Sequence, residues 1–378
     1  MKINVIGGGP AGLYFALLMR GRDAAHEITV FERNAAGSTF GWGVVFSDKT
    51  LAYLRDNDEP THREITRAFA TWDNVDVVHR GEKITIRGNK FSGIARIRLL
   101  NILQSRCDEL GVRLRFEEEV ADVDALRDCD LLVGADGVNS SVRALYADRF
   151  GPELSVRANK YVWFGTRRLF HGLTLTFREN ADGVFAAHSY KFDARTSTFI
   201  VECDPETWEA AGFGAKTDEG ARAYLQEVFA DDLCGRELLS NNSRWINFLL
   251  VRNARWHFEN VVLLGDALHT AHFSIGSGTK LALEDSVALA RAFDESRVVA
   301  EALASFESAR RPVVEEYQRA AYESLVWFEH MRDYVHLAPL EFAYSLMTRS
   351  KRITAESLRR RDRAFVAAYE SAVAGGGD

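Results

Sequence analysis

Residues 2–21, KINVIGGGPAGLYFALLMRG, decide the fold of this chain. A short apolar run ends at Gly7 and a helical pattern begins near Pro10, so the glycines lie in a turn between a buried strand and a helix. In the pattern Gly7-x-Gly9-x-x-Gly12, Gly7 permits the tight turn, Gly9 lets the backbone approach a pyrophosphate, and Gly12 lets helix and strand pack closely. The free N–H groups at the start of the helix favour an anion. The stretch therefore predicts an α/β dinucleotide-binding unit.

An acid at the end of the next strand supports this interpretation. EITVFER follows as a second strand, and Glu32 lies at its end, about 20 residues beyond the glycines, where a carboxylate bonds ribose hydroxyl groups. Both NAD and FAD fit these two features.

The stretch LLGDALHTAHFSIGSGTK, residues 263–280, separates the two cofactors. An apolar run ends at Asp266, whose carboxylate can bond a ribityl or ribose hydroxyl group. Gly276 and Gly278 precede a helical pattern, and the dipole of that helix favours negative charge at its start. A flavin ring that becomes anionic on reduction gains from this placement, so we expect the ligand to be FAD.

Two further patterns near these motifs have simpler explanations. Asp136-Gly137 follows the apolar run DLLVG, and Asp-Gly alone indicates only a turn. His269 and His272 lie close to Asp266, as metal ligands can, but small and apolar residues separate them and no HExxH pattern occurs. We expect no metal, and we interpret both histidines as loop residues near the cofactor.

Composition restricts the class of protein. The chain has 378 residues, with 47 basic and 54 acidic side chains and a net charge of −7, which argues against nucleic acid as a partner. The longest apolar runs fall far short of the roughly 20 residues of a membrane span, and the N-terminus shows no charged leader. Four cysteines without CxxC spacing are typical of reduced thiols. These features predict a cytoplasmic protein with no membrane partner.

The pattern along the chain predicts interleaved domains. Residues 157–250 are β-rich, with a helix near 217–230, whereas NVVLLGDA returns to a strand of the first type. We therefore predict a discontinuous cofactor domain over 1–155 and 255–310, a substrate-binding β-sheet domain over 156–254, and a helical C-terminal region over 311–378.

Three motifs in this order, GGGPAG, GADGVNSSVR and LLGDALHTAHFSIGSG, resemble those of the single-component FAD-dependent aromatic hydroxylases. The resemblance covers nearly the whole chain. It implies an α/β fold in which a Rossmann-like FAD-binding domain is interleaved with a β-rich substrate domain and a helical C-terminal part. It also implies bound FAD, NADH or NADPH as electron donor, and O2 as co-substrate.

The resemblance assigns cofactor contacts residue by residue. Gly7, Gly9 and Gly12 match the pyrophosphate turn, Glu32 the ribose-binding acid with Arg33 beside it, and Arg96 an arginine that reaches the cofactor. Asp136 and Gly137 match a motif associated with FAD and NAD(P)H, Asp266 the ribityl-binding acid, and Gly276 and Gly278 the flavin-facing loop. GWGVVFS, with Gly43 and Val44, looks like the segment that borders the isoalloxazine. Many members have proline where Phe273 lies and asparagine where Lys280 lies, so the pocket at the flavin differs from theirs.

The segments GWGVVFSD, NKYVWFGT and AHFSIGSGTKLALED look like those of the members that hydroxylate salicylyl-CoA at position 5. They are also similar to the hydroxylase half of 2-aminobenzoyl-CoA monooxygenase/reductase and to the tryptophan-type hydroxylase of violacein biosynthesis. The resemblance implies conversion of salicylyl-CoA to 2,5-dihydroxybenzoyl-CoA through a C4a-hydroperoxyflavin. The alternatives are a free aromatic or indolic intermediate and 2-aminobenzoyl-CoA.

Deprotonation of a phenol would make its ring more reactive, so a base near the substrate is expected. His188, Tyr190 and His272 are the catalytic candidates, although such residues on a half-buried strand are more often structural. The substrate-binding candidates are Phe273 at the flavin loop and, for the phosphates of CoA, Lys160, Arg167 and Arg168, with the later run from Arg349 to Arg363 as a second positive surface.

Two other classes of flavoprotein remain as alternatives. A flavin-dependent halogenase shares part of the fold, but the chain has no Trp-x-Trp-x-Ile-Pro segment. A flavin-binding module without oxygenase chemistry would bind FAD and show no ligand-stimulated oxygen uptake. The sequence leaves open whether the protein is a monomer or a homodimer.

Overall fold

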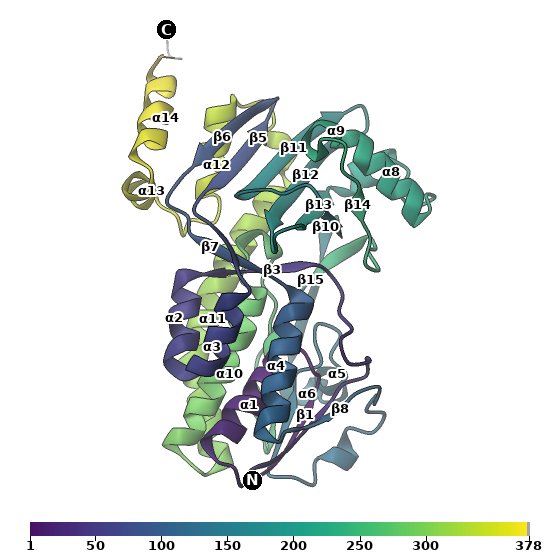
Figure 1. Ribbon diagram of the computed structural model, residues 1–378, viewed down its shortest axis with the longest axis vertical. Helices are drawn as coiled ribbons and strands as arrows, with labels where there is room; N and C mark the ends of the chain where they lie inside the picture. The colour runs from purple at the N-terminus through teal and green to yellow at the C-terminus, as the bar shows by residue number, and fades with distance from the viewer. Residues whose placement is uncertain (376–378) are drawn as a thin grey trace.

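The computed structural model describes residues 1–375. One half of the molecule is built on a six-stranded sheet (Figure 1). All neighbouring strands pair in parallel except the edge strand β16. The strand order is β16 (His257–Phe258), β17 (Val261–Leu263), β9 (Leu131–Gly134), β1 (Lys2–Ile6), β2 (Glu27–Phe31) and β8 (Arg113–Arg115). Because β17 comes from late in the chain, this sheet is completed only after the second half has been made.

Helix α1 (Pro10–Arg22) follows β1 directly, as the glycine pattern predicts. It packs between α4 (Arg96–Leu110) and α10 (Gly278–Glu295), and every residue from Pro10 to Met19 is buried. Its apolar residues surround the helix on all sides, which suits a position inside the protein. Two short helices, α5 (Ser141–Leu145) and α6 (Ala147–Phe150), follow β9.

The second half is built on an eight-stranded sheet. Its neighbouring strands are antiparallel, apart from the parallel pair β5 and β11. The order is β14 (Leu238–Leu239), β10 (Pro152–Thr166), β13 (Ser197–Cys203), β12 (Gly183–Lys191), β11 (Leu173–Asn180), β5 (Val75–His79) and β6 (Glu82–Ile86), with β15 (Ile246–Asn253) also paired to β10. The antiparallel sheet predicted over 157–250 is confirmed. However, β5 and β6 come from the segment 1–155, which was expected to belong wholly to the cofactor domain.

A small sheet lies where the two halves meet (Figure 1). It consists of β3 (Gly43–Ser47), β7 (Phe91–Ala95) and β4 (Ala70–Trp72), and the helices α2 (Asp48–Asn57) and α3 (Glu59–Arg67) belong to the same part of the chain. This sheet places Gly43 between the FAD-type motifs and the substrate-type sheet.

The two faces of the eight-stranded sheet have different neighbours. One face packs against α7 (Pro205–Ala210), α8 (Asp218–Val228), α9 (Ala230–Leu233) and the residues that adjoin these helices. The core on this face includes Val162, Phe199 and Val201 of the sheet. Because side chains alternate along a strand, His188 and Glu202 point to the opposite face. On that face Leu175 and Ala186 pack against residues 327–347, and Tyr190 contacts Gly43.

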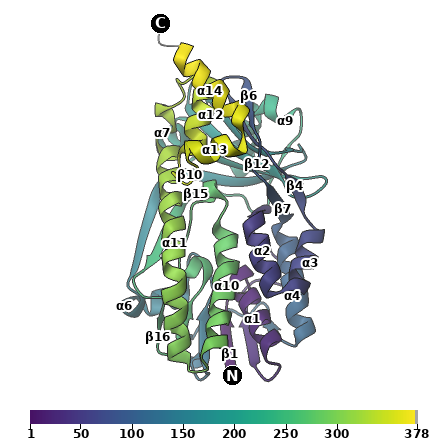
Figure 2. The same cartoon turned by 90° about the vertical axis from the view of Figure 1, so that its left-hand side faces the viewer.

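Helix α11 (Val299–Glu329) runs along both halves of the molecule (Figure 2). It is followed by α12 (Pro339–Thr348), α13 (Ala355–Arg361) and α14 (Arg363–Gly375). α11 crosses the domain boundary predicted at residues 310/311, and the last three residues of the predicted helical region lie outside the described residues. None of the helices in residues 1–375 is long and apolar enough to cross a membrane.

Candidate active site

The turn after β1 has the geometry of a pyrophosphate cradle. Gly7 has φ +111°, and a Cβ there would lie 2.2 Å from the carbonyl oxygen of Ala135; a Cβ on Gly12 would lie 2.1 Å from the carbonyl oxygen of Gly7. Close packing thus requires glycine at both positions. By contrast, no atom lies within 4 Å of a Cβ on Gly9, the residue that caps the N-terminus of α1. The space in front of the helix N-terminus can therefore receive an anionic group.

Glu32 lies beside this turn. Its Oε2 accepts from the backbone N–H of Gly8 at 2.8 Å, and its Oε1 accepts from the backbone N–H of Asn34 at 2.8 Å. Oε1 also accepts from Nδ2 of Asn34 at 2.6 Å, so Oε2 is the oxygen that keeps a second lone pair for a ribose hydroxyl group. Arg33 follows with an exposed side chain.

Asp266 and Arg96 face each other across the same edge of the six-stranded sheet. Burial raises the pKa of Asp266, and the nearby charge of Arg96 opposes that rise. Asp266 is nevertheless exposed to water, so its carboxylate is open to a ligand. Within residues 1–375 no ion pair joins the two groups, so both can contact a cofactor.

The segment bordering the predicted flavin site is tied to the substrate-type sheet. The backbone N–H of Gly43 donates to Oγ1 of Thr198 at 3.0 Å, and the hydroxyl group of Tyr190 donates to the carbonyl oxygen of Gly43 at 2.8 Å. A Cβ on Gly43 would lie 2.6 Å from Phe192, so glycine is needed for this approach. Val44 is buried beside it.

The Asp136-Gly137 turn serves first to organise its own loop. Oδ2 of Asp136 accepts from the backbone N–H groups of Ser141 at 2.7 Å and Val142 at 3.2 Å, at the start of α5. Arg143 is buried and donates from Nη1 to the carbonyl oxygen of Ala267 at 3.0 Å. Arg143 thus links this loop to the one that carries Asp266, while a cofactor contact by Asp136 or Gly137 stays a prediction.

The loop before α10 leaves open space at its glycines, as a planar flavin ring requires. No atom lies within 4 Å of a Cβ on Gly276 or Gly278, and Gly276 has φ +62°. Because the ends of β1, β2 and β17 lie at one edge of a parallel sheet, Gly9, Glu32 and Asp266 meet there. These residues fit FAD: an open helix start for the pyrophosphate, carboxylates for the ribose and ribityl groups, and bare backbone for the flavin.

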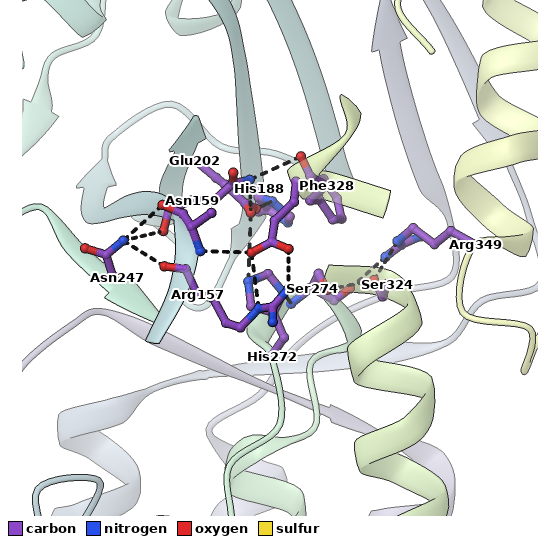
Figure 3. Close-up of polar contacts among 12 residues, drawn as sticks. Arg157, Asn159, His188, Glu202, Asn247, His272, Ser274, Ser324, Phe328 and Arg349 are labelled. Carbon is purple, nitrogen blue, oxygen red and sulfur yellow. Dashed lines mark hydrogen bonds and ion pairs between the residues drawn. The ribbon is translucent and has the colours of Figure 1, made fainter. Parts of the chain in front are cut away.

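A buried polar cluster lies on the inward face of the eight-stranded sheet (Figure 3). Nε2 of His188 lies 3.2 Å from Oε2 of Glu202, and Nε2 of His272 lies 3.9 Å from Oε1 of the same carboxylate. The strand register explains the first contact, since His188 and Glu202 are diagonal neighbours on β12 and β13. The structure thus brings two of the three catalytic candidates together around an acid that the sequence analysis did not single out.

Aromatic rings surround this cluster. Phe273 packs against Tyr161 with ring centroids 4.7 Å apart, and the ring of His188 lies 5.3 Å from Phe273 and 4.8 Å from Phe328. Such a setting suits an aromatic ligand. Phe273 was predicted as a substrate contact, and it lies within reach of both histidines.

Tyr190 lies elsewhere on the same face. It is buried, stacks on Trp72 with centroids 5.9 Å apart, and uses its hydroxyl group to hold Gly43. Burial raises the pKa of its hydroxyl group above the ordinary value. Its position makes it a support for the flavin-bordering segment, and a catalytic role for it stays a prediction.

The positive residues predicted to hold CoA are spread out. Nζ of Lys160 donates to Oδ1 of Asn247 and lies over Trp208, and Arg168 donates to the carbonyl oxygen of Asp232, both on the side of the sheet away from His188. Arg167 is exposed. In the later run, Arg349 turns inward and donates from Nη2 to the carbonyl oxygen of Ser274 at 2.7 Å.

Glu202, Ser274 and Ser324 are the polar residues that sequence reasoning missed. One signal was available: Glu202 interrupts the apolar run FIVEC, and alternation places it on the same face as Thr198 and Ile200. The serines carry no such signal, because their contacts depend on α11 lying against the flavin loop.

The sequence matches the family model described as an FAD binding domain over residues 1–321. It is 44% identical to a salicyloyl-CoA 5-hydroxylase of Streptomyces sp over 377 residues, which cover 97% of this chain and 72% of the relative. It is 39% identical to a 3-hydroxy-4-methyl-anthranilyl-[aryl-carrier protein] 5-monooxygenase of Streptosporangium sibiricum, over 88% of this chain and 90% of that one.

The fold is similar to that of a solved structure, 2-methyl-3-hydroxypyridine-5-carboxylic acid oxygenase, with a TM-score of 0.73 and 18% identity over 95% of both chains. The family match, these relatives and the cofactor-type geometry agree. The chain belongs to the FAD binding domain family and is an FAD-dependent monooxygenase of the aromatic hydroxylase type.

Proposed function

We propose that this enzyme hydroxylates an aromatic acyl thioester, and that its substrate is salicylyl-CoA, converted to 2,5-dihydroxybenzoyl-CoA. The observation that carries the proposal is the 44% identity to a salicyloyl-CoA 5-hydroxylase along 97% of the chain. A 39% identical relative acts on an anthranilyl group held by an aryl-carrier protein, which is again a ring joined through a thioester arm. Two relatives with the same kind of substrate favour thioesters over free acids.

The polar cluster supports an electron-rich ring as the substrate. When bound, FAD supplies the two-electron chemistry that activates O2, with NADH or NADPH as the proposed electron donor. The residues of the chain then have to orient the ring, exclude water and handle the proton of its hydroxyl or amino group. Phe273, Tyr161 and Phe328 form the apolar walls, and His188 and His272 are the polar groups beside them.

The phosphate-binding residues remain a proposal. Lys160 and Arg168 face away from His188 and Arg167 is exposed, whereas Arg349 contacts Ser274 in the loop before α10. If CoA enters between α11 and the residues after α12, charge reversal at Arg352 weakens binding of the thioester and charge reversal at Arg167 does not. Titration of the two variants with salicylyl-CoA, at two salt concentrations, checks this.

A second candidate substrate is a free aromatic or indolic intermediate. It is favoured by 35% identity to a protodeoxyviolaceinate monooxygenase of Chromobacterium violaceum over 93% of this chain. A substrate panel decides between them. NADH or NADPH loss, oxygen uptake and hydroxylated product are measured together for salicylyl-CoA, 2-aminobenzoyl-CoA, salicylate and tryptophan derivatives. Coupled turnover with the free acids alone would refute the thioester proposal.

A further inference from the structure

Glu202 is a deeply buried carboxylate with three polar groups around it. It is 1% exposed; Nδ2 of Asn159 donates to its Oε1 at 2.9 Å, and Nε2 of His188 lies 3.2 Å from its Oε2. Burial by itself raises the pKa of Glu202, but the hydrogen bonds from His188 and Asn159, with the charges of His188 and His272 when these are protonated, outweigh it, so the pKa lies below its ordinary value. An ionised carboxylate can only accept hydrogen bonds, so Nε2 of His188 carries a proton.

The protonation of His272 follows from a chain of hydroxyl groups (Figure 3). Nε of Arg349 can only donate, and it donates to Oγ of Ser324 at 2.8 Å. The backbone N–H of Ser274 points at Nδ1 of His272, at 3.4 Å, so this nitrogen carries a lone pair. The hydroxyl group of Ser274 then donates to Nδ1 of His272 at 2.8 Å and accepts from the hydroxyl group of Ser324 at 2.7 Å.

His272 is thus held as a neutral ring with its proton on Nε2, directed at Glu202. Burial lowers the pKa of His272 to about 4, which agrees with a neutral ring at pH 7. Nδ1 accepts from Ser274, and Nε2 carries the proton and lies 3.9 Å from the carboxylate, so neither nitrogen offers a free lone pair to take a proton from a substrate. His272 is therefore a positioning residue, and so are Ser274 and Ser324, which fix its tautomer.

His188 has the opposite arrangement. Its Nε2 is engaged by Glu202, so the lone pair of the neutral ring is on Nδ1. Nδ1 makes no hydrogen bond to any of the residues 1–375 and, unlike the sealed Nδ1 of His269, it is not among the atoms shut off from solvent. The ring lies between Phe273 and Phe328, the walls of the aromatic site. A nitrogen with no hydrogen-bond partner among the described residues therefore lies in a ring that packs against Phe273 and Phe328.

We propose that Glu202 and His188 act as a dyad in which Nδ1 of His188 takes the proton of the ring hydroxyl group of the substrate. This role rests on the proposed function. The O–H bond of the phenol breaks and an N–H bond forms at Nδ1, which leaves a phenolate and an imidazolium ion. The imidazolium keeps its Nε2–H bond to Glu202, and it returns the proton when the product hydroxyl group is reprotonated. The carboxylate stabilises the imidazolium and fixes its tautomer.

Other titratable groups surround the dyad, and all the variants compared below share them. They come from β10, the loop before α10, α11, the residue after α12 and β13: Arg157, Tyr161, His272, Glu329, Arg349 and Cys203. Because these residues are unchanged in the test, a difference between variants reports the dyad.

The test follows the ionisation of a bound ligand in the FAD-loaded enzyme without reductant. Salicylyl-CoA is titrated from pH 5.5 to 9, and the phenolate is measured by ultraviolet difference spectra, with benzoyl-CoA as the ligand that lacks the hydroxyl group. At a given pH we expect at least about tenfold more phenolate in the native enzyme than in Glu202→Gln or His188→Asn. His257→Asn, which removes a histidine paired with Glu307 at 3.6 Å outside the site, behaves like the native enzyme. Equal ionisation in all four proteins, each with ligand bound, overturns the dyad.

A second measurement keeps the result independent of the substrate. Nitrogen NMR of the FAD-loaded, ¹⁵N-histidine-labelled enzyme reports which ring nitrogen carries the proton, and His188→Asn identifies the signal of His188. We expect the Nε2–H tautomer in the native enzyme at neutral pH and a change in Glu202→Gln. An Nδ1–H tautomer overturns the dyad whatever the substrate. An enzyme that shows the expected tautomer but does not bind salicylyl-CoA refutes the proposed substrate alone.

Discussion

Replacing Asp285 by asparagine tests how the flavin loop is anchored. Asp285 lies in α10, is fully buried, and accepts from Nε of Arg310 at 2.7 Å and contacts Nε2 of His269 at 2.8 Å. Arg310 also pairs with Glu284 at 3.0 Å, which in turn pairs with Lys280 at 2.7 Å. This ion chain connects the first turn of α10, directly after Gly278, with α11 and with the loop that follows Asp266.

Asparagine keeps the shape of the side chain but removes its buried charge. Its NH2 group would also face either Arg310 or His269, the two partners of the carboxylate. Removing one partner of a buried ion pair costs about 3–5 kcal/mol of unfolding free energy. With an unfolding entropy of about 2.1 cal/mol/K per residue, a chain of 378 residues loses about 4–6 °C of melting temperature. We expect this loss in Asp285→Asn, together with weaker FAD retention.

Asp294→Asn is the matched control, because Asp294 lies in the same helix and pairs with Arg22 at 2.8 Å with half of its side chain exposed. Exposed pairs contribute at most about 1 kcal/mol, so its melting temperature should fall by no more than about 1 °C. Differential scanning calorimetry of both variants, with and without FAD, measures the difference. If Asp285→Asn melts no lower than Asp294→Asn, the anchoring role assigned to the ion chain is wrong.

Three further predictions concern the cofactor site and its pH dependence. Gly9→Val should fold with a near-native melting temperature but lose bound FAD, because a Cβ at this position has no protein atom within 4 Å. Gly12→Val should fail to fold stably, because a Cβ there would lie 2.1 Å from the carbonyl oxygen of Gly7; flavin content and thermal melts distinguish the two variants. Asp266→Asn should weaken FAD binding about tenfold to a hundredfold in a fluorescence titration. The melting temperature of the FAD-free protein should change little, because the residue is exposed to water there; a parallel loss of both would contradict this. The pKa values of Glu202 and Asp285 in the folded protein lie below their ordinary values, near 4. Both ionised carboxylates therefore stabilise the fold fully above about pH 4, and this stabilisation is lost as the pH falls through the pKa values of the folded protein; a melting temperature that does not decline between about pH 5 and 3 would refute this prediction.

The cofactor half could be predicted from the sequence because its constraints are local. A pyrophosphate requires close backbone at Gly9, and tight packing requires glycine at Gly7 and Gly12, so the motif lies within a few residues. The open backbone at Gly276 and Gly278 is likewise specified within a few residues of the sequence. Asp136 shows the limit of such patterns, since its carboxylate caps the following helix as a turn residue does.

The substrate half depends on pairings that are distant in sequence. β5 joins the large sheet by pairing in parallel with β11, about a hundred residues later, and nothing in the residues of β5 specifies that partner. Glu202 acquires its role only through the register that sets it diagonally to His188, and through Asn159 on the next strand. Ser324 reaches the site from α11, which also could not be placed from its helical pattern alone.

The helix α11 has a consequence for how the whole protein denatures. At about 1.5 Å per residue its 31 residues span about 46 Å, and it contributes Arg310 to the ion chain of the cofactor half and Phe328 to the core beside the substrate sheet. Neither half can release this helix without exposing the interior of the other. Heating or denaturant should therefore melt the two halves in a single cooperative transition, and limited proteolysis should yield no fragment that survives on its own.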